Sequence, residues 1–291
     1  MPNNPTVAVL MTCFNRRSET VKCLDALFQN HIPTGLKLTV FLVDDGSSDG
    51  TSEEVATKFP EVQLIQGTGK LYWGGGMRLA FSVALVEDFD FYVWLNDDTF
   101  LFRDSIERVF SVYEQVSSKT TGDSIIVGTT CDQITSEPTY GGQIRPNPRR
   151  RLGFKLVTPS TVLLRCETIN GNFVLIPRAV VEKVGILDQA FVHSMGDIDY
   201  GLRVVNAGCA SWVMPGFVGT CSTNSFIGTF NDRKLPLRIR LTKMFEPKGL
   251  PILSWKVLTR RHTGILWIAY WLWPYGRVIA QSLARKLFLF K

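Results

Sequence analysis

Two adjacent carboxylates, Asp97 and Asp98, stand directly after a strongly apolar segment and are preceded by Asn96. Neighbouring carboxylates form a site of hard oxygen ligands, which suits Mg²⁺ or Mn²⁺, and the oxygens of a diphosphate can fill the remaining ligand positions. A metal ion held there can neutralise a departing diphosphate. The same letters are also typical of an aspartate-capped turn, so the triplet alone leaves its role open.

Two further polar clusters stand directly after apolar segments. The first is TCFNR at residues 12–16, and the second is DDGSSDG at residues 44–50. A carboxylate in the second cluster can accept hydrogen bonds from a nucleobase imide or a ribose hydroxyl. Turn and helix-cap chemistry is the alternative for this cluster, because Asp, Ser and Gly are the residues that turns prefer.

Three consecutive glycines, Gly74, Gly75 and Gly76, precede Met77 and Arg78. We expect them to form a loop before a helix over residues 77–86, where backbone N–H groups can approach an anion and Arg78 adds positive charge. The dinucleotide-binding pattern GxGxxG is absent. A tight loop without a ligand is the alternative.

A fourth acidic segment, GDIDYGLR, begins at Gly196 and places Asp197 at an expected helix start. Its carboxylate is a candidate general base that takes the proton from an acceptor hydroxyl. The alternative is structural, because an acidic residue stabilises a helix N-terminus. Asp199 is two residues further on and therefore points in another direction. The three histidines of the chain form no ligand set.

An alternation of strands and helices must position these clusters. We expect strands at residues 7–11, 38–43, 62–65, 91–95, 124–127, 161–165, 172–176 and 210–214. Helices are expected over residues 18–30, 77–86 and 178–184 and from residues 51 and 197, with loops or a hairpin over 131–160. Such alternation predicts right-handed crossovers and a mostly parallel sheet. Ligands bind beyond the carboxyl ends of such strands, so the first three clusters should converge there.

Charge divides the chain into two parts. Residues 1–232 carry 19 Lys and Arg against 25 Asp and Glu, whereas residues 233–291 carry 13 against 1. We therefore expect an acidic catalytic domain over 1–232 and a basic, helical C-terminal segment over 233–291. The six cysteines contain no CxxC pair, which favours buried, reduced thiols over a zinc site or disulfides. The N-terminus shows no signal peptide.

The C-terminal segment combines two basic clusters with the apolar, aromatic-rich run GILWIAYWLWPY at residues 264–275. This run is shorter than the roughly 20 residues that a spanning helix needs. Trp and Tyr beside basic residues favour the interface of an anionic membrane. The alternatives are a helical cap on the catalytic domain or an oligomer interface. No motif supports binding of nucleic acid.

Four segments, taken in order, resemble family 2 glycosyltransferases of the GT-A fold: VAVLMTCFNR, FLVDDGSSDGT, WLNDDT and GDIDYGLRVVNAG. The resemblance covers residues 5–225 and implies an α/β domain with a mostly parallel central sheet flanked by helices. The run YWGGGMR and the C-terminal segment are similar to those of bacterial enzymes that build O-antigen, capsule or other surface polysaccharides. Many of those enzymes are rhamnosyltransferases.

The resemblance also implies a role for each matching residue. Asp98, assisted by Asp97, stands where the family has the metal-binding DXD motif, and Asp197 matches the catalytic base. The resemblance implies that Thr12, Phe14, Asn15, Asp44 and Asp45 hold the base and ribose of the donor. Together with the glycine run and its arginine, the full predicted donor-binding set is Thr12, Phe14, Asn15, Arg16, Asp44, Asp45, Gly74, Gly75, Gly76, Arg78, Asn96 and Asp97. The acceptor side is assigned to Asn172, Asp199 and Arg203.

The chain departs from the family pattern at three places. The first letter of DXD is Asn96, and residues 219–224 contain no histidine where many relatives have a metal ligand. We therefore expect Mg²⁺ or Mn²⁺ to be held mainly by Asp98, the diphosphate and water. The processive signature QxxRW is also missing, which favours addition of one or a few sugars.

The sequence thus predicts an inverting glycosyltransferase that is attached peripherally to the cytoplasmic face of the cell membrane. Its donor is a dTDP- or UDP-linked sugar, with dTDP-rhamnose favoured by the resemblance, and its acceptor is a lipid-linked glycan. One alternative is a metal-dependent phosphohydrolase or nucleotidyltransferase, which also needs adjacent carboxylates. Another is a non-catalytic, membrane-associated binding module.

Overall fold

The computed structural model describes the backbone of residues 4–289 and the side chains of residues 4–284. Its centre is a mixed sheet with the strand order β3-β2-β1-β4-β11-β6-β12-β5, to which β9 (Leu164–Arg165) adds beside β12. The path contains β1 (Thr6–Cys13), β2 (Lys37–Asp44), β3 (Gln63–Gln66), β4 (Phe91–Leu95), β5 (Phe100–Leu101), β6 (Ser124–Cys131), β11 (Phe173–Pro177) and β12 (Ala210–Thr220). Neighbours from β3 to β4 are parallel, whereas β11 is antiparallel to both β4 and β6.

Helices cover both faces of the sheet because its strands carry apolar side chains on both sides. In β1, Val7, Val9 and Met11 belong to one core, and Ala8 and Leu10 belong to the other. The first core is closed by α1 (Arg17–Phe28), α2 (Thr51–Lys58) and α4 (Ser105–Lys119). The second is closed by α3 (Tyr72–Ala84), α5 (Arg178–Val184) and α6 (Gly196–Asn206). The expected α/β class is confirmed, but the sheet is more mixed than expected, because β11 is antiparallel to β4 and β6 and β12 is antiparallel to β5 and β9.

The loop predicted at the three glycines is wrong, because they lie in the first turns of α3 and are buried. Close packing is the physical reason for their presence. A Cβ atom on Gly74 would lie 2.4 Å from the Phe191 carbonyl oxygen, and one on Gly76 would lie 2.1 Å from Thr12 Oγ1. Only glycine lets α3 approach the end of β1 this closely.

A second, small sheet covers the region in which loops or a hairpin were expected. It consists of β7 (Gly142–Ile144), β8 (Lys155–Leu156) and β10 (Thr168–Ile169), with β7 antiparallel to both of the others. All six cysteines of the chain are buried and free, as expected from their spacing.

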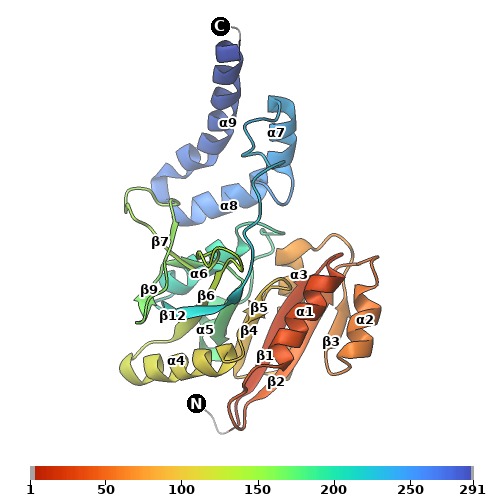
Figure 1. Ribbon diagram of the computed structural model, residues 1–291. Coiled ribbons are helices and arrows are strands. Elements are labelled where there is room, and N and C mark those ends of the chain that lie inside the picture. The colour runs from red at the N-terminus through yellow and green to blue at the C-terminus, as the bar shows by residue number, and fades with distance from the viewer. Residues whose placement is uncertain (1–3, 290–291) are drawn as a thin grey trace.

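Helices follow in the C-terminal segment: α7 (Leu237–Phe245), α8 (Ile252–His262), the short η2 (Gly264–Leu266) and α9 (Trp267–Leu289). Figure 1 shows them beyond the end of the sheet toward which β1 runs, with α8 against the body and α9 extending away. Leu258 of α8 packs in a small core with Phe191 and Met195, which precede α6. Within residues 4–289, no helix is both long enough and apolar enough to cross a membrane.

Candidate active site

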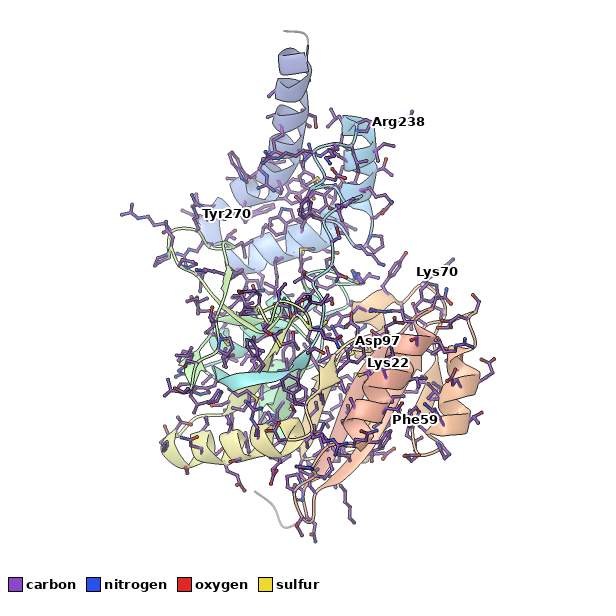
Figure 2. All side chains as sticks on the ribbon, viewed as in Figure 1. Lys22, Phe59, Lys70, Asp97, Arg238 and Tyr270 are labelled. Atoms are coloured by element: carbon purple, nitrogen blue, oxygen red, sulfur yellow. The ribbon has the colours of Figure 1, made fainter. Side chains whose placement is uncertain are left out.

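The three strand-end clusters meet at one edge of the sheet, as the order of elements predicts. Arg16 follows β1, and its guanidinium donates from Nη2 to Asp98 Oδ2 at 2.8 Å and from Nη1 to Asp97 Oδ1 at 3.3 Å. The N–H of Asn15 donates to Ser47 Oγ at 2.8 Å, which joins the first cluster to the second. Figure 2 shows Asp97 between the N-terminal half of the sheet and the later strands.

Asp97 is the most strongly perturbed carboxyl group of this edge. Its side chain is buried, and its Oδ2 atom has no hydrogen-bond partner in the described part of the chain. Burial raises its pKa to about 7; the positive charge of Arg16 opposes this rise, and the neighbouring Asp98 adds to it. A carboxyl group with a free oxygen and a pKa near neutrality is a candidate for a functional role.

Asn96 and Trp73 form a contact that the sequence did not reveal. The indole Nε1–H of Trp73, in α3, donates to Asn96 Oδ1 at 2.7 Å. The same indole lies against two glycines near Asp197, because a Cβ atom on Gly171 would be 2.6 Å from Trp73 Cζ2 and one on Gly196 would be 3.7 Å from Trp73 Cζ3. Trp73 therefore separates the NDD segment from the predicted base. A tryptophan beside a glycine run was the only sequence signal for it.

Asp44 and Asp45 hold the turns around the site together. Asp45 accepts the backbone N–H groups of Gly69 and Tyr72, one on each carboxylate oxygen, both at 2.8 Å. Asp44 accepts the N–H of Ser47 at 2.9 Å and the hydroxyl of Ser52. Turn and cap chemistry, the alternative that the sequence left open, thus describes both carboxylates in this structure. Contact of either with a nucleobase stays a prediction.

In helix α3, the backbone N–H groups of two glycines have partners within the protein, whereas one guanidinium nitrogen of Arg78 has none among the described residues. The N–H groups of Gly74 and Gly75 already donate to the carbonyl oxygen of Val192, at 2.7 and 3.1 Å. Arg78 is half-buried, and its Nη1 atom is buried without a hydrogen-bond partner among the described residues. A buried guanidinium nitrogen without a partner is costly unless a ligand supplies one.

Asp197 lies at the N-terminus of α6, where the sequence placed it. Its Oδ2 atom accepts the N–H of Gly171 at 3.2 Å, and its Oδ1 atom accepts the N–H of Ile198 at 2.8 Å. Burial raises the pKa of Asp197, and these backbone hydrogen bonds counteract the rise only in part. A raised pKa makes a carboxylate a better proton acceptor.

Asp199 and Arg203 form buried contacts inside the protein, and their predicted acceptor contact stays a prediction. The side chain of Asp199 is fully buried and accepts bonds from Arg203 Nε at 2.8 Å, Arg261 Nη1 at 2.7 Å and His262 Nε2 at 2.9 Å. Arg203 also donates to the carbonyl of Ile186 at 2.8 Å. Both carboxylate oxygens of Asp199 are therefore engaged inside the protein, and its bonds to Arg261 and His262 join α6 to α8. Arg261 and His262 were missed from the sequence because their partner lies about 60 residues away.

Asn172 also has partners inside the protein, and its predicted contact with an acceptor stays a prediction. It is 4% exposed, and its Nδ2 donates to Thr99 Oγ1 at 3.3 Å and to Cys221 Sγ at 3.4 Å. Cys221 belongs to the segment 219–224, which contains no histidine. Burial and the nearby Asp98 raise the pKa of its thiol to about 12, so it stays neutral.

A divalent cation fits the NDD segment only with help from the substrate. No group of three His, Cys, Asp or Glu side chains in the described part of the chain could hold a metal ion. Asp98 and the unpartnered Oδ2 of Asp97 are hard oxygen ligands of the kind that Mg²⁺ and Mn²⁺ prefer. These carboxylates could hold such an ion together with diphosphate oxygens and water.

Comparison with known proteins agrees with this geometry. Residues 8–170 match the model of glycosyl transferase family 2. The fold is similar to that of a mannosyltransferase, PcManGT from Pyrobaculum calidifontis, solved with GDP-Man and Mn²⁺: the TM-score is 0.56 at 15% identity over 98% of this chain and 75% of that one. It is also similar to S. aureus TarS 1–349 in complex with UDP, with a TM-score of 0.53 at 14% identity over 87% of this chain and 70% of that one. No curated protein matches.

Proposed function

The chain belongs to glycosyl transferase family 2, and we propose that it transfers a sugar from a nucleotide sugar to a hydroxyl group of a lipid-linked glycan, with inversion at the anomeric carbon. The observation that carries this proposal is the convergence of Arg16, Asp97 and Asp98 at one strand edge, with Asp197 on the other side of Trp73. This arrangement provides an arginine and two metal-binding carboxylates for a diphosphate, and a separate carboxylate base.

The donor is held at the ends of β1 and β4. The ring of Phe14 is 49% exposed beside Asn15 and offers a face on which a nucleobase can stack. Arg16 and Arg78 bring two positive charges, of which the Nη1 atom of Arg78 has no partner within residues 4–284. We favour a dTDP- or UDP-linked donor, and dTDP-rhamnose by resemblance to surface-polysaccharide enzymes. The two structural neighbours were solved with UDP and with GDP-Man.

Asp197 performs the proton transfer. The acceptor hydroxyl gives its proton to the Asp197 carboxylate while its oxygen attacks the anomeric carbon from the face opposite the diphosphate. The bond between that carbon and the diphosphate oxygen breaks, and the electron pair leaves with the nucleoside diphosphate. Arg16 and Arg78 stabilise the negative charge that develops on the leaving group. Mg²⁺ or Mn²⁺ at Asp98 and Asp97 supplies further charge neutralisation when bound.

A panel of nucleotide sugars tests this proposal against its rivals. We expect sugar transfer with the preferred donor, little donor hydrolysis, and loss of transfer in Asp98→Ala. Asp88→Asn is the matched control, because the side chain of Asp88 is 76% exposed and pairs with Arg178, away from the site. Hydrolysis without transfer supports a phosphohydrolase, and binding without turnover supports a binding module; either result contradicts the proposal.

The acceptor is lipid-linked because the C-terminal helices carry the protein to an anionic membrane surface. These helices are basic and expose apolar side chains, with Ile265 96%, Leu266 54% and Ile268 51% exposed around the start of α9. Basic and exposed apolar groups on one segment favour an anionic lipid interface. The protein then acts at the cytoplasmic face of the membrane, where nucleotide sugars are present.

Vesicle sedimentation tests this attachment. We expect the double variant Ile265→Ser/Leu266→Ser to lose binding to anionic vesicles and the wild-type protein to retain it. Ile134→Ser is the control, because Ile134 is 92% exposed but lies outside the C-terminal segment. Equal sedimentation of all three proteins contradicts the membrane role.

A further inference from the structure

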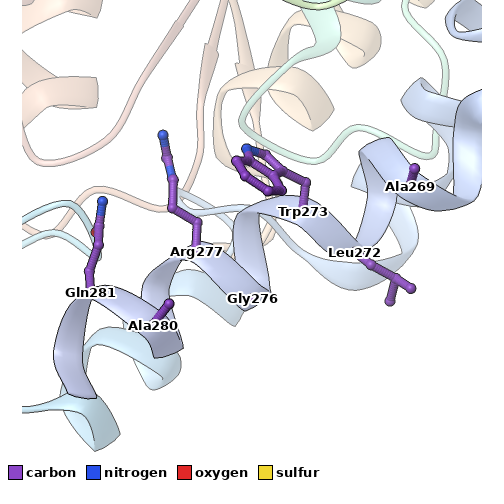
Figure 3. A pocket seen from close by; sticks show the side chains of 7 residues that line it. All are labelled: Ala269, Leu272, Trp273, Gly276, Arg277, Ala280 and Gln281. Carbon is purple, nitrogen blue, oxygen red and sulfur yellow. The ribbon is translucent and has the colours of Figure 1, made fainter. Parts of the chain in front are cut away.

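A groove with a volume of about 680 Å³ lies between the loop that joins β7 to β8 and the start of α9. Its lining combines apolar and aromatic side chains with two arginines, and includes Arg150, Leu152, Trp255, Tyr270, Trp273 and Arg277. A second hollow of about 450 Å³ shares Trp273 and Arg277 and continues along α9 to Gln281. Figure 3 shows Trp273, Arg277 and Gln281 projecting from the same side of α9 and Leu272 from the opposite side.

The floor of the groove is continuous with the surroundings of the predicted base. Leu152 and Trp255, which line the groove, pack in the same apolar cluster as Met195 and Ile198. Met195 precedes α6, and Ile198 directly follows Asp197. The apolar cluster that lines the groove therefore extends to the residue next to Asp197 in the sequence.

The charge of the groove selects an anion. Neither Arg150 nor Arg277 forms a salt bridge with a described residue, and no acidic side chain lines either hollow. Glu246 is the only acidic residue after Asp232, and it pairs with Lys243 at 3.1 Å. The arginines stand beside indole and phenol rings, so the groove offers cations and an apolar wall together.

We propose that this groove binds the lipid carrier of the acceptor, with its phosphate between Arg150 and Arg277 and its apolar chain against Trp273 and Tyr270. The inference rests on the proposed function, because it presumes a lipid-linked acceptor. Arginine recognises phosphate through charge-assisted hydrogen bonds, and the rings give a chain a dry surface. A free sugar needs many polar partners, which this lining does not supply. Binding to a flat membrane surface does not require a concave site, so the groove favours a single lipid molecule.

Binding of geranylgeranyl diphosphate, below its micelle concentration, tests the groove directly through quenching of tryptophan fluorescence. We expect saturable binding that weakens about tenfold in Arg277→Gln, as loss of a charged hydrogen bond implies. Trp273→Ala should weaken it as well, and its 69% exposure makes misfolding a minor concern. Arg238→Gln is the matched control on α7, and circular dichroism checks the fold of each variant.

Two further ligands separate the possible sources of binding. Inorganic diphosphate carries the head without the chain, and geranylgeraniol carries the chain without the head. We expect both to bind much more weakly than the complete amphiphile. Equal affinity of inorganic diphosphate, equal affinity of the wild-type protein and Arg277→Gln, or binding only to anionic vesicles overturns the proposal.

Transfer assays distinguish failure of this inference from failure of the proposed function. With a lipid-linked acceptor, Arg277→Gln should raise KM and leave kcat nearly unchanged. With the same acceptor sugar lacking its lipid, Arg277→Gln and the wild-type protein should be equal. An unchanged KM for the lipid-linked acceptor contradicts the groove but leaves glycosyl transfer intact. Absence of any transfer by the wild-type protein contradicts the proposed function, and the binding experiment still decides the groove.

Discussion

Replacement of Asp199 by Asn should loosen the attachment of the C-terminal helices to the catalytic domain. The Asp199 carboxylate is fully buried and accepts hydrogen bonds from Arg203 on its own helix and from Arg261 and His262 on α8. Asn keeps the shape of the side chain but removes the negative charge. Two guanidinium groups then remain around a neutral amide.

The expected loss in the free energy of unfolding depends on the hydrogen-bond partners that Arg261 and Arg203 retain in the variant. Breaking a buried ion pair by removing one partner costs about 3 to 5 kcal/mol. Arg261 retains a salt bridge to Asp188 at 2.7 Å and is about one-third exposed, and Arg203 retains a bond to the Ile186 carbonyl at 2.8 Å. We therefore expect the lower end, a loss of about 3 kcal/mol in the free energy of unfolding.

The same carboxylate gives the effect a pH signature. Burial raises the pKa of Asp199, but the bonds from His262 and Arg203 outweigh it, so the pKa is lower than usual. Its contribution to stability is thus present above the ordinary pKa of about 4 and is lost as the pH falls below it. Asp199→Asn should lack this acid-dependent loss.

Urea unfolding at pH 7 and at low pH measures both effects. Asp104→Asn is the control, because Asp104 forms an exposed pair with Arg108 and should cost less than about 1 kcal/mol. A cycle with Arg261→Gln should show coupling between positions 199 and 261. If the stability of Asp199→Asn is within about 1 kcal/mol of the wild-type value, the buried charge of Asp199 does not stabilise the attachment of α8 as proposed.

Three other perturbations have defined outcomes. Because burial raises the pKa of Asp97 to about 7, ionisation of Asp97 should lower the stability of the nucleotide-free protein by about 2 to 3 kcal/mol between pH 5 and pH 8. Urea unfolding of Asp97→Asn should not show this loss. Identical pH profiles of the variant and the wild-type protein contradict the prediction. Gly76→Ala should destabilise by about 1 to 3 kcal/mol through its clash with Thr12, whereas Gly276→Ala, with open space around it, should not lower the melting temperature. Arg16→Gln should weaken nucleoside diphosphate binding about tenfold in calorimetry, and unchanged affinity refutes its donor role.

Several features of the site were predictable from the order of apolar and polar segments along the sequence. Apolar runs that end in TCFNR, DDGSSDG and NDD predicted parallel strands whose ends meet, and the bonds of Arg16 to Asp97 and Asp98 confirm that convergence. This inference needed no side-chain detail, because parallel strands place their carboxyl ends at one edge. The helix start at Asp197 was equally readable from the sequence.

Other features depended on contacts that sequence does not encode locally. The glycines of α3 predict a loop when taken alone, but Gly74 is required by the backbone of residues 191 and 192 and Gly76 by the side chain of Thr12, both of which are distant in the sequence. The sequence likewise gave no indication that Asp199 pairs with Arg261 and His262, because these partners stand on a distant helix. Long-range packing decided these positions, and local propensity gave no indication of it.

Sugar transfer by Asp197→Asn tests directly whether Asp197 is the catalytic base. The measurement is turnover from the preferred nucleotide sugar to its natural acceptor, with binding of the nucleoside diphosphate measured on the same protein. We expect the wild-type protein to transfer the sugar with inversion, and Asp197→Asn to bind the nucleotide normally but to lose nearly all transfer. Near-normal turnover by Asp197→Asn contradicts the assignment of the base and the mechanism built on it.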